Sequence, residues 1–124
     1  MSISFDSYAW IEYFSGSAKG KTVRKIIETD EQIYTPSICL AEIKGKYLRE
    51  KKAFGDRVEF ILTRSTIIDI TREMALMAAD IREKEGLPTV DALIYSAAKA
   101  YKTKLLTGDK HFYGKDEIIF LEEK

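Results

Sequence analysis

The sequence is poor in cysteine and proline, with one cysteine and two prolines among its 124 residues. A single cysteine excludes an internal disulfide and is typical of a protein from a reducing compartment. Because Cys39 lies in the apolar run Ile38-Cys39-Leu40-Ala41, we interpret it as a core residue rather than a thiol nucleophile. With so little proline and no low-complexity segment, the chain has no room for a disordered linker. We therefore expect residues 1–124 to form a single domain.

Net charge and long apolar runs are also absent. Lysine plus arginine equals aspartate plus glutamate, at 20 each, so overall charge does not indicate a nucleic-acid-binding protein and only local clusters can. No apolar run reaches membrane-spanning length, and the N-terminus lacks the basic and then apolar pattern of a signal peptide. The apolar and aromatic fractions, 45% and 11%, are those of ordinary globular proteins. We expect a soluble, cytoplasmic protein without a membrane partner.

Hydrophobic periodicity predicts strands that alternate with helices. The expected strands are residues 3–5, 32–35, 66–70, 105–107 and 118–121. The expected helices are residues 8–14, 20–29, 36–52, 53–64, 71–86 and 90–102. In the third of these helices we place Pro36 at the first helical position and Thr35 at the cap. Strands separated by helices predict an α/β fold, with a mainly parallel central sheet of about five strands covered on both faces.

Four acidic residues lie where a predicted strand ends or a predicted helix begins. Asp6 and Asp109 directly follow apolar strands, Asp91 lies in the first turn of a helix, and Glu42 lies near the second turn of another. In open parallel sheets, ligands bind beyond the carboxyl ends of the strands, so these four positions are compatible with one pocket. A cluster of four carboxylates indicates a site for a divalent cation.

Each acidic residue also has an ordinary structural explanation. Asp6 could cap the helix that follows it, Asp91 could favour the positive end of a helix dipole, and Asp109 could serve a turn after Gly108. Glu42 could pair with Lys46 one helical turn later.

The lysines and arginines concentrate in residues 44–57, which contain only two acidic residues. The basic members of this segment are Lys44, Lys46, Arg49, Lys51, Lys52 and Arg57. This segment is the best local candidate for contact with phosphate groups, and a solvated helix face explains it as well. The single histidine, His111, is followed by Phe112 in a turn, and we assign it a structural role rather than that of a general base.

Residues 15–22 come close to a phosphate-binding loop. That motif requires a glycine where this chain has Ser15, and a buried strand where this chain has an aromatic, helix-like segment. A phosphatase of the haloacid dehalogenase type also begins with an aspartate at a strand end, but its second aspartate would fall on Tyr8. We set both interpretations aside.

Four segments together resemble the PIN-domain ribonucleases, in particular the toxins of VapBC toxin–antitoxin pairs. They are residues 5–11 (FDSYAWI), 36–43 (PSICLAEI), 87–94 (LPTVDALI) and 105–112 (LLTGDKHF). Their order and separation fit the family, and the resemblance spans essentially the whole chain. It implies a PIN-like three-layer α/β/α fold. It also maps the family's acidic quartet onto Asp6, Glu42, Asp91 and Asp109, and its supporting hydroxyl onto Thr107.

The resemblance implies a ribonuclease dependent on Mg²⁺ or Mn²⁺, cations that prefer oxygen ligands. In this interpretation Asp6, Asp91 and Asp109 are metal ligands, and Glu42 is a ligand or positions the attacking water. Thr107 hydrogen-bonds a carboxylate or the substrate. The implied partners are an RNA substrate, a separate antitoxin chain that could itself use the basic segment, and a second copy of the chain in a homodimer. The alternative is a non-catalytic module that keeps the fold and binds protein or RNA.

Overall fold

The computed structural model describes residues 2–122. Its strands are β1 (Ser2–Phe5), β2 (Gln32–Pro36), β3 (Thr66–Ile68), β4 (Lys104–Thr107) and β5 (Ile118–Phe120). Its α-helices are α1 (Ser7–Ser15), α2 (Ala18–Ile27), α3 (Ser37–Arg49), α4 (Gly55–Arg64), α5 (Arg72–Glu85) and α6 (Thr89–Ala100). A short 3₁₀ helix, η1 (Lys110–Phe112), follows β4 and was not predicted.

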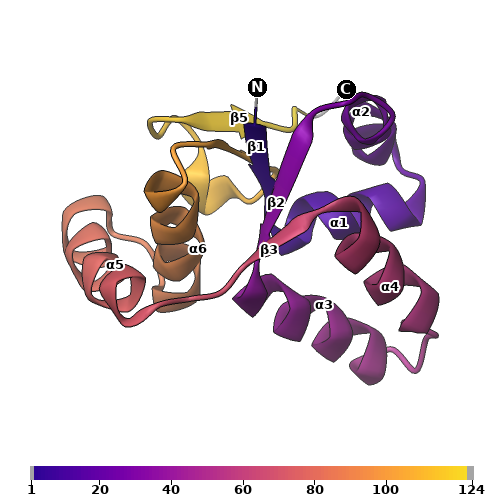
Figure 1. The fold of residues 1–124 in the computed structure, drawn as a ribbon, viewed down its shortest axis with the longest axis horizontal. Helices are drawn as coiled ribbons and strands as arrows, with labels where there is room; N and C mark the ends of the chain where they lie inside the picture. The colour runs from indigo at the N-terminus through magenta and orange to yellow at the C-terminus, as the bar shows by residue number, and fades with distance from the viewer. Residues whose placement is uncertain (1, 123–124) are drawn as a thin grey trace.

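The five strands form one sheet in the order β3-β2-β1-β4-β5, and all four strand pairs are parallel. Figure 1 shows the sheet between two helical layers, with α5 and α6 on one face and α1, α2 and α4 on the other. The prediction of a three-layer α/β/α fold with about five mainly parallel strands is therefore confirmed. The chain extends the sheet from β1 first to one side and then to the other, so the strand order reverses between β1 and β4. Such a reversal leaves a crevice at the carboxyl ends of the two strands.

Most predicted elements are present within a few residues of their expected bounds. The prediction for the start of α3 was wrong, because Pro36 still belongs to β2 and is the N-cap of the helix. Thr35 is not a cap, because its buried hydroxyl accepts a hydrogen bond from Trp10 Nε1 at 3.0 Å and lies 2.8 Å from Ser65 Oγ. Helix α2 begins earlier than expected, because Ser17 Oγ accepts from the backbone N–H of Gly20 at 3.0 Å and caps it.

The core joins both faces of the central strands to the covering helices. Trp10 is fully buried, and its ring lies 5.0 Å from that of Phe5 and 6.2 Å from that of Phe60. Because α1 follows β1 after a single residue, this packing determines the direction in which α1 leaves the sheet. The junction of β1 and α1 is therefore fixed by the packing of Trp10 against Phe5 of β1 and Phe60 of α4.

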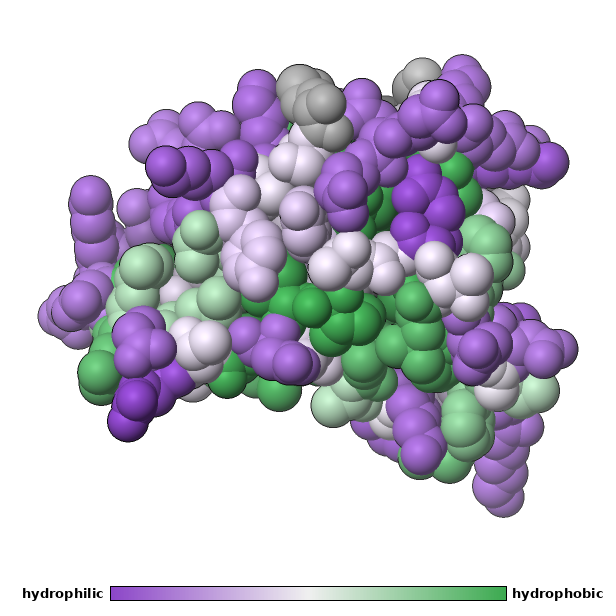
Figure 2. All heavy atoms as spheres, viewed as in Figure 1, coloured by the Kyte–Doolittle hydropathy of each residue, from purple (hydrophilic) through white to green (hydrophobic). Residues whose placement is uncertain are grey.

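The surface divides into polar margins and an apolar centre. Figure 2 shows hydrophilic side chains around the upper and outer margins of this face, and a band of apolar atoms across its middle, where Figure 1 places β3 and the start of α3. Among the helices of residues 2–122, none combines the length and the apolar character needed to cross a membrane.

Candidate metal centre

Asp6 lies at the junction of β1 and α1 and is 2% exposed. Its Oδ1 accepts a hydrogen bond from the backbone N–H of Ala9 at 2.9 Å, so it caps α1 as the ordinary explanation foresaw. Burial above all, together with the charges of Asp109 and Glu42, raises the pKa of Asp6 to about 7, although hydrogen bonds from Thr107 and Ala9 act in the opposite direction. A carboxyl group with this pKa is still largely protonated just below neutral pH, and a bound cation would favour its charged form.

Thr107 joins the ends of the two central strands. Phe5 pairs with Leu106 in the β1–β4 register, so Asp6 and Thr107 follow side by side. Thr107 is fully buried, hydrogen-bonds the Asp6 carboxylate, and accepts from the backbone N–H of Asp109 at 3.0 Å. One hydroxyl thus orients both a carboxylate of β1 and the loop after β4.

Glu42 faces the cluster from the second turn of α3. Its Oε1 accepts a hydrogen bond from Ser7 Oγ at 2.8 Å. Burial raises the pKa of Glu42, and the neighbouring charges of Asp91 and Asp109 raise it further. The suggested pairing of Glu42 with Lys46 is not made, because Lys46 pairs with Glu50 instead. Ser7 was not singled out in the sequence, although its position next to Asp6 was a usable signal.

Asp91 and Asp109 meet at the same edge of the sheet, together with His111. Ligand atoms of these three residues all lie within 4.8 Å of one another. His111 Nδ1 lies 2.7 Å from Asp91 Oδ2 and 3.3 Å from Asp109 Oδ1. Burial raises the pKa of Asp91, and the hydrogen bond from His111 counteracts that effect.

His111 therefore contacts the acidic cluster, which the sequence did not lead us to expect. The turn does bury its neighbour Phe112, but the imidazole itself points to two of the predicted site residues. Asp109 caps η1 by accepting from the backbone N–H of His111 at 2.9 Å, and this short helix directs the ring toward Asp91. The sequence showed the histidine two residues after Asp109 but not the α6 carboxylate that it would contact.

The donors at this edge suit Mg²⁺ or Mn²⁺. Four carboxylates come from the ends of β1 and β4, from the second turn of α3 and from the first turn of α6. Each carries a charge that raises the pKa of a neighbour or has its own pKa raised. Hard oxygen donors in this number match divalent cations, and the crowding of their charges is what a cation relieves. The thiol of Cys39 is buried nearby, and burial with the charges of Asp6 and Glu42 raises its pKa well above its usual value, which favours the protonated thiol.

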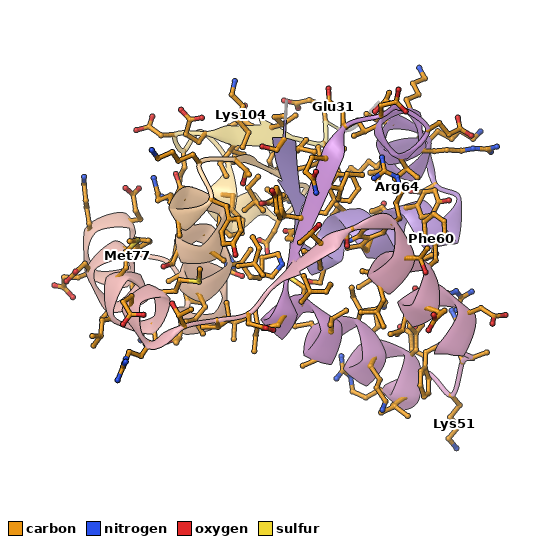
Figure 3. The ribbon with its side chains drawn as sticks, in the orientation of Figure 1. Glu31, Lys51, Phe60, Arg64, Met77 and Lys104 are labelled. Carbon is orange, nitrogen blue, oxygen red and sulfur yellow. The ribbon has the colours of Figure 1, made fainter. Side chains whose placement is uncertain are left out.

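The basic segment lies mainly at the far end of α3. Lys46 and Lys52 both pair with Glu50, and Lys44 lies over the ring of Phe54. Figure 3 shows Lys51 beyond the end of α3, away from the carboxyl edge of the sheet. About eight residues of helix separate Glu42 from Glu50, which is roughly 12 Å along the axis. Lys51 and Lys52 could therefore contact only a long substrate or a partner that reaches well beyond the carboxylates, whereas Lys44 and Lys46 lie within about one helical turn of Glu42.

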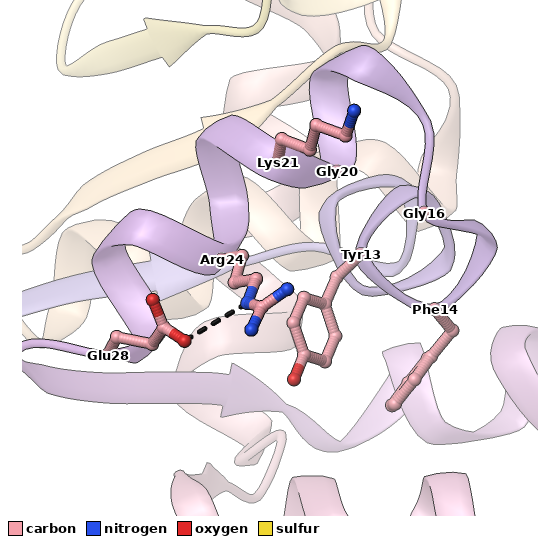
Figure 4. Close-up of a pocket in the computed structure, with 7 residues that line it drawn as sticks. All are labelled: Tyr13, Phe14, Gly16, Gly20, Lys21, Arg24 and Glu28. Atoms are coloured by element: carbon pink, nitrogen blue, oxygen red, sulfur yellow. Dashed lines mark hydrogen bonds and ion pairs between the residues drawn. The ribbon is translucent and has the colours of Figure 1, made fainter.

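Hollows lie at both ends of α1. One, of about 430 Å³, borders the acidic cluster through Asp109. The other, of about 520 Å³, lies at the opposite end of α1 and contains Tyr13, Phe14, Gly16, Gly20 and Lys21, with Arg24 paired to Glu28 (Figure 4). This second hollow includes the segment that came close to a phosphate-binding loop, which here folds as the cap of α1 and the start of α2.

Known proteins place this geometry in a family. Residues 3–118 match the family model of the PIN domain. A search of curated proteins found no match. Similar solved structures include a toxin–antitoxin complex from Klebsiella pneumoniae, with 23% identity, 98% of this chain and 99% of that chain covered, and a TM-score of 0.83.

Two further solved structures share the fold. VapBC2 from Rickettsia felis, bound to a DNA fragment from its promoter, has 22% identity, 97% of each chain covered and a TM-score of 0.75. VapC20 from Mycobacterium tuberculosis, described as a toxin that cleaves the sarcin–ricin loop, has 16% identity, 94% of this chain and 98% of that chain covered, and a TM-score of 0.69. With the family match over nearly its whole length, the chain belongs to the PIN domain family.

Proposed function

We propose that this protein is a metal-dependent endoribonuclease that hydrolyses RNA phosphodiester bonds. The observation that carries the proposal is the meeting of Asp6, Glu42, Asp91 and Asp109 at the point where the strand order reverses. Membership of the PIN domain family supports it. The similar VapC20, which is described as a toxin that cleaves the sarcin–ricin loop, supports the choice of RNA as substrate.

In this proposal Asp6, Asp91 and Asp109 hold Mg²⁺ or Mn²⁺. When bound, such a cation supplies charge neutralisation at the phosphate and helps a water molecule to ionise. Glu42 is a further ligand or orients the attacking water, and Ser7 holds its carboxylate in place. Thr107 orients Asp6, and the Nδ1–H of His111 donates to Asp91 Oδ2 and orients that carboxylate. No side chain needs to form a covalent bond to the RNA.

We further propose that the protein is the toxin of a toxin–antitoxin pair, with a separate antitoxin protein as its partner. Two of the similar solved structures are a toxin–antitoxin complex and a VapBC complex, which supports this assignment. Co-expression with the product of a neighbouring small reading frame, followed by co-purification, tests for such a partner. Growth arrest on expression of this chain alone, relieved by the second chain, is the expected result.

The nuclease activity is tested by incubating RNA with Mn²⁺ and either the wild type or Asp91→Asn at matched concentration. We expect cleavage by the wild type and none by the variant. Asp80→Asn, which changes an exposed aspartate of α5, is the matched control and should cleave like the wild type. Cleavage that persists in Asp91→Asn would assign the activity to another site or to a contaminant.

The metal site is tested independently of cleavage. Titration with Mg²⁺ or Mn²⁺ should raise the melting temperature of the wild type and have a much smaller effect on Asp6→Asn. An equal response of both proteins would contradict the metal site and favour the alternative of a non-catalytic binding module.

A further inference from the structure

The hollow that borders Asp109 has an unusual combination of walls. It is formed by Tyr8 of α1, Lys19 of α2, Gly108 and Asp109 of the loop after β4, Lys110 of η1, and Phe120 and Leu121 at the end of β5. Phe120 pairs with Thr107 in the β4–β5 register, so the end of β5 lies directly beside the proposed metal centre. At about 430 Å³ the hollow falls within the usual range of small-ligand pockets.

Tyr8 forms a fixed wall of this pocket. A Cβ atom at Gly108 would lie 2.3 Å from Tyr8 Cε1, so only glycine lets the loop after β4 approach the ring this closely. The Tyr8 hydroxyl accepts a hydrogen bond from Lys19 Nζ at 2.9 Å, and the same ammonium lies 5.3 Å from the ring centroid. The ring and the ammonium are thus positioned together beside the loop that carries Asp109.

The pocket offers two kinds of contact. Lys19 and the exposed Lys110 place two ammonium groups around it, whereas Asp109 is the one carboxylate among its described lining residues. Phe120 and Leu121 supply apolar surface, and the Phe120 ring is held at 5.0 Å from that of Tyr113 in an edge-to-face contact. An aromatic surface flanked by ammonium groups suits a ligand that has a flat base and a phosphate.

We propose that this pocket binds the nucleotide next to the cleaved bond of a single-stranded RNA. The base of this nucleotide stacks against Phe120, and Tyr8 forms another wall of the pocket. The phosphate of the nucleotide contacts Lys19 and Lys110. This inference rests on the proposed nuclease function, because the shared residue Asp109 connects the pocket to the metal centre. It assigns RNA binding near the chemistry to residues outside the basic segment 44–57.

Binding is measured by fluorescence anisotropy in EDTA, so that no cleavage is required. The probe is a labelled single-stranded RNA of about ten nucleotides, and a duplex of the same sequence is the second probe. We expect Phe120→Ala to weaken single-strand binding roughly 5- to 100-fold, as is found when a stacking aromatic residue is removed, and to affect the duplex much less. Phe120→Tyr should retain most of the affinity.

The phosphate contacts are measured from the dependence of affinity on salt. Lys19→Gln and Lys110→Gln should each reduce the slope of log K against log salt by about 0.7, the value for one contact to a single strand. Lys104→Gln is the matched control, because Lys104 lies at the opposite edge of the sheet (Figure 3) and should leave the slope unchanged. Melting temperatures of all variants verify that each is folded.

Wild-type affinity and slope in folded Phe120→Ala, Lys19→Gln and Lys110→Gln would overturn the pocket assignment, and so would equal losses in Lys104→Gln. The cleavage assay separates this failure from that of the nuclease proposal. A wild type that cleaves RNA while the pocket variants bind normally retains the nuclease function and loses the pocket. A wild type that binds single strands through these residues but never cleaves them retains the pocket and loses the nuclease function.

Discussion

At the scale of single residues, Asp6 combines two roles with opposite requirements. Its carboxylate caps α1, which favours a charged and hydrogen-bonded oxygen, yet it is buried beside other acids, which favours the neutral form. The conflict is resolved when a cation is present. Without a cation, burying the charged Asp6 carboxylate lowers the free energy of unfolding of the protein.

The first prediction concerns the stability of the metal-free protein. The pKa of Asp6 is about 7 in the folded state and about 4 in an unfolded chain, so the folded state binds the proton more tightly. The contribution of Asp6 to the free energy of unfolding therefore falls as pH rises from about 4 to about 7, and it is constant above that pH. Asp6→Asn should stabilise the protein in EDTA by up to about 4 kcal/mol at pH 8 and by much less at pH 5.

Urea denaturation of both proteins at the two pH values measures this difference. Asparagine can still accept the hydrogen bond from Ala9, so the helix cap is kept. A stability difference that is the same at pH 5 and pH 8 would show that burial of the Asp6 charge is not its cause.

The second prediction concerns His111. Its side chain is 57% exposed, so replacing it should leave the melting temperature of the metal-free protein nearly unchanged. Because it orients Asp91, His111→Ala should lower the affinity for Mn²⁺ by roughly 10- to 100-fold, as is usual for groups that hold a metal ligand in place. Isothermal titration with Mn²⁺ measures the affinity.

His111→Asn is the matched variant, because its amide N–H can replace Nδ1–H as a donor to Asp91. It should recover part of the lost affinity. Wild-type Mn²⁺ binding by His111→Ala would return the histidine to the purely structural role expected from its turn.

At the scale of elements, the contact between α1 and α2 depends on Gly20. A Cβ atom there would lie 2.0 Å from the backbone oxygen of Glu12 and 2.7 Å from its carbonyl carbon. Backbone atoms of a packed helix cannot move aside as a flexible side chain does. Gly20 therefore sets the distance between α1, which begins at the metal centre, and α2, which carries Lys19.

The third prediction follows from this contact. Gly20→Ala should destabilise the protein by about 1–3 kcal/mol through overpacking, despite the higher helix propensity of alanine. Gly45→Ala is the matched control, because Gly45 is also inside a helix but its nearest neighbour would be the flexible end of Arg49 at 3.4 Å. The free energy of unfolding of Gly45→Ala should rise by up to about 1 kcal/mol, because alanine has the higher helix propensity.

Thermal unfolding of the two variants measures both effects. Melting temperatures that rise in both variants would show that α1 and α2 can separate at little cost, contrary to the packing described.

At the scale of the whole molecule, three of the large exposed apolar side chains lie on α5 or directly after α6. Leu76 is 71% exposed and Met77 is 39% exposed on α5, and Tyr101 is 45% exposed just after α6. Figure 3 shows Met77 on the outer side of this layer. Large apolar groups exposed on one layer make that layer a candidate for an interface between proteins.

The fourth prediction is that the protein forms a homodimer that buries this surface. Leu76→Arg should then convert the dimer to a monomer while leaving its melting behaviour two-state. Light scattering after size-exclusion chromatography measures the mass. Leu62→Arg, which changes an exposed leucine of α4, is the control and should remain dimeric. An unchanged mass for Leu76→Arg would exclude this surface as the dimer contact.

The sequence alone determined the elements and the residue types of the site. Apolar periodicity and capping act between near neighbours in the chain, so the cap at Thr71, the end of α5 at Gly86 and the stripe of α6 could be read directly. The four acids could be proposed because each lies next to an element end. The start of α3 was misread because the hydroxyl of Thr35 bonds to Trp10, 25 residues earlier in the chain, rather than to its own helix.

The tertiary structure alone decided which groups meet. The register of β1 against β4 places Asp6 beside Thr107, and the docking of α6 brings Asp91 to His111, 20 residues away in the chain. The register of β4 against β5 places Phe120 next to the same centre and opens the pocket under Tyr8. These contacts depend on sheet order and on packing between distant segments, which no local pattern encodes.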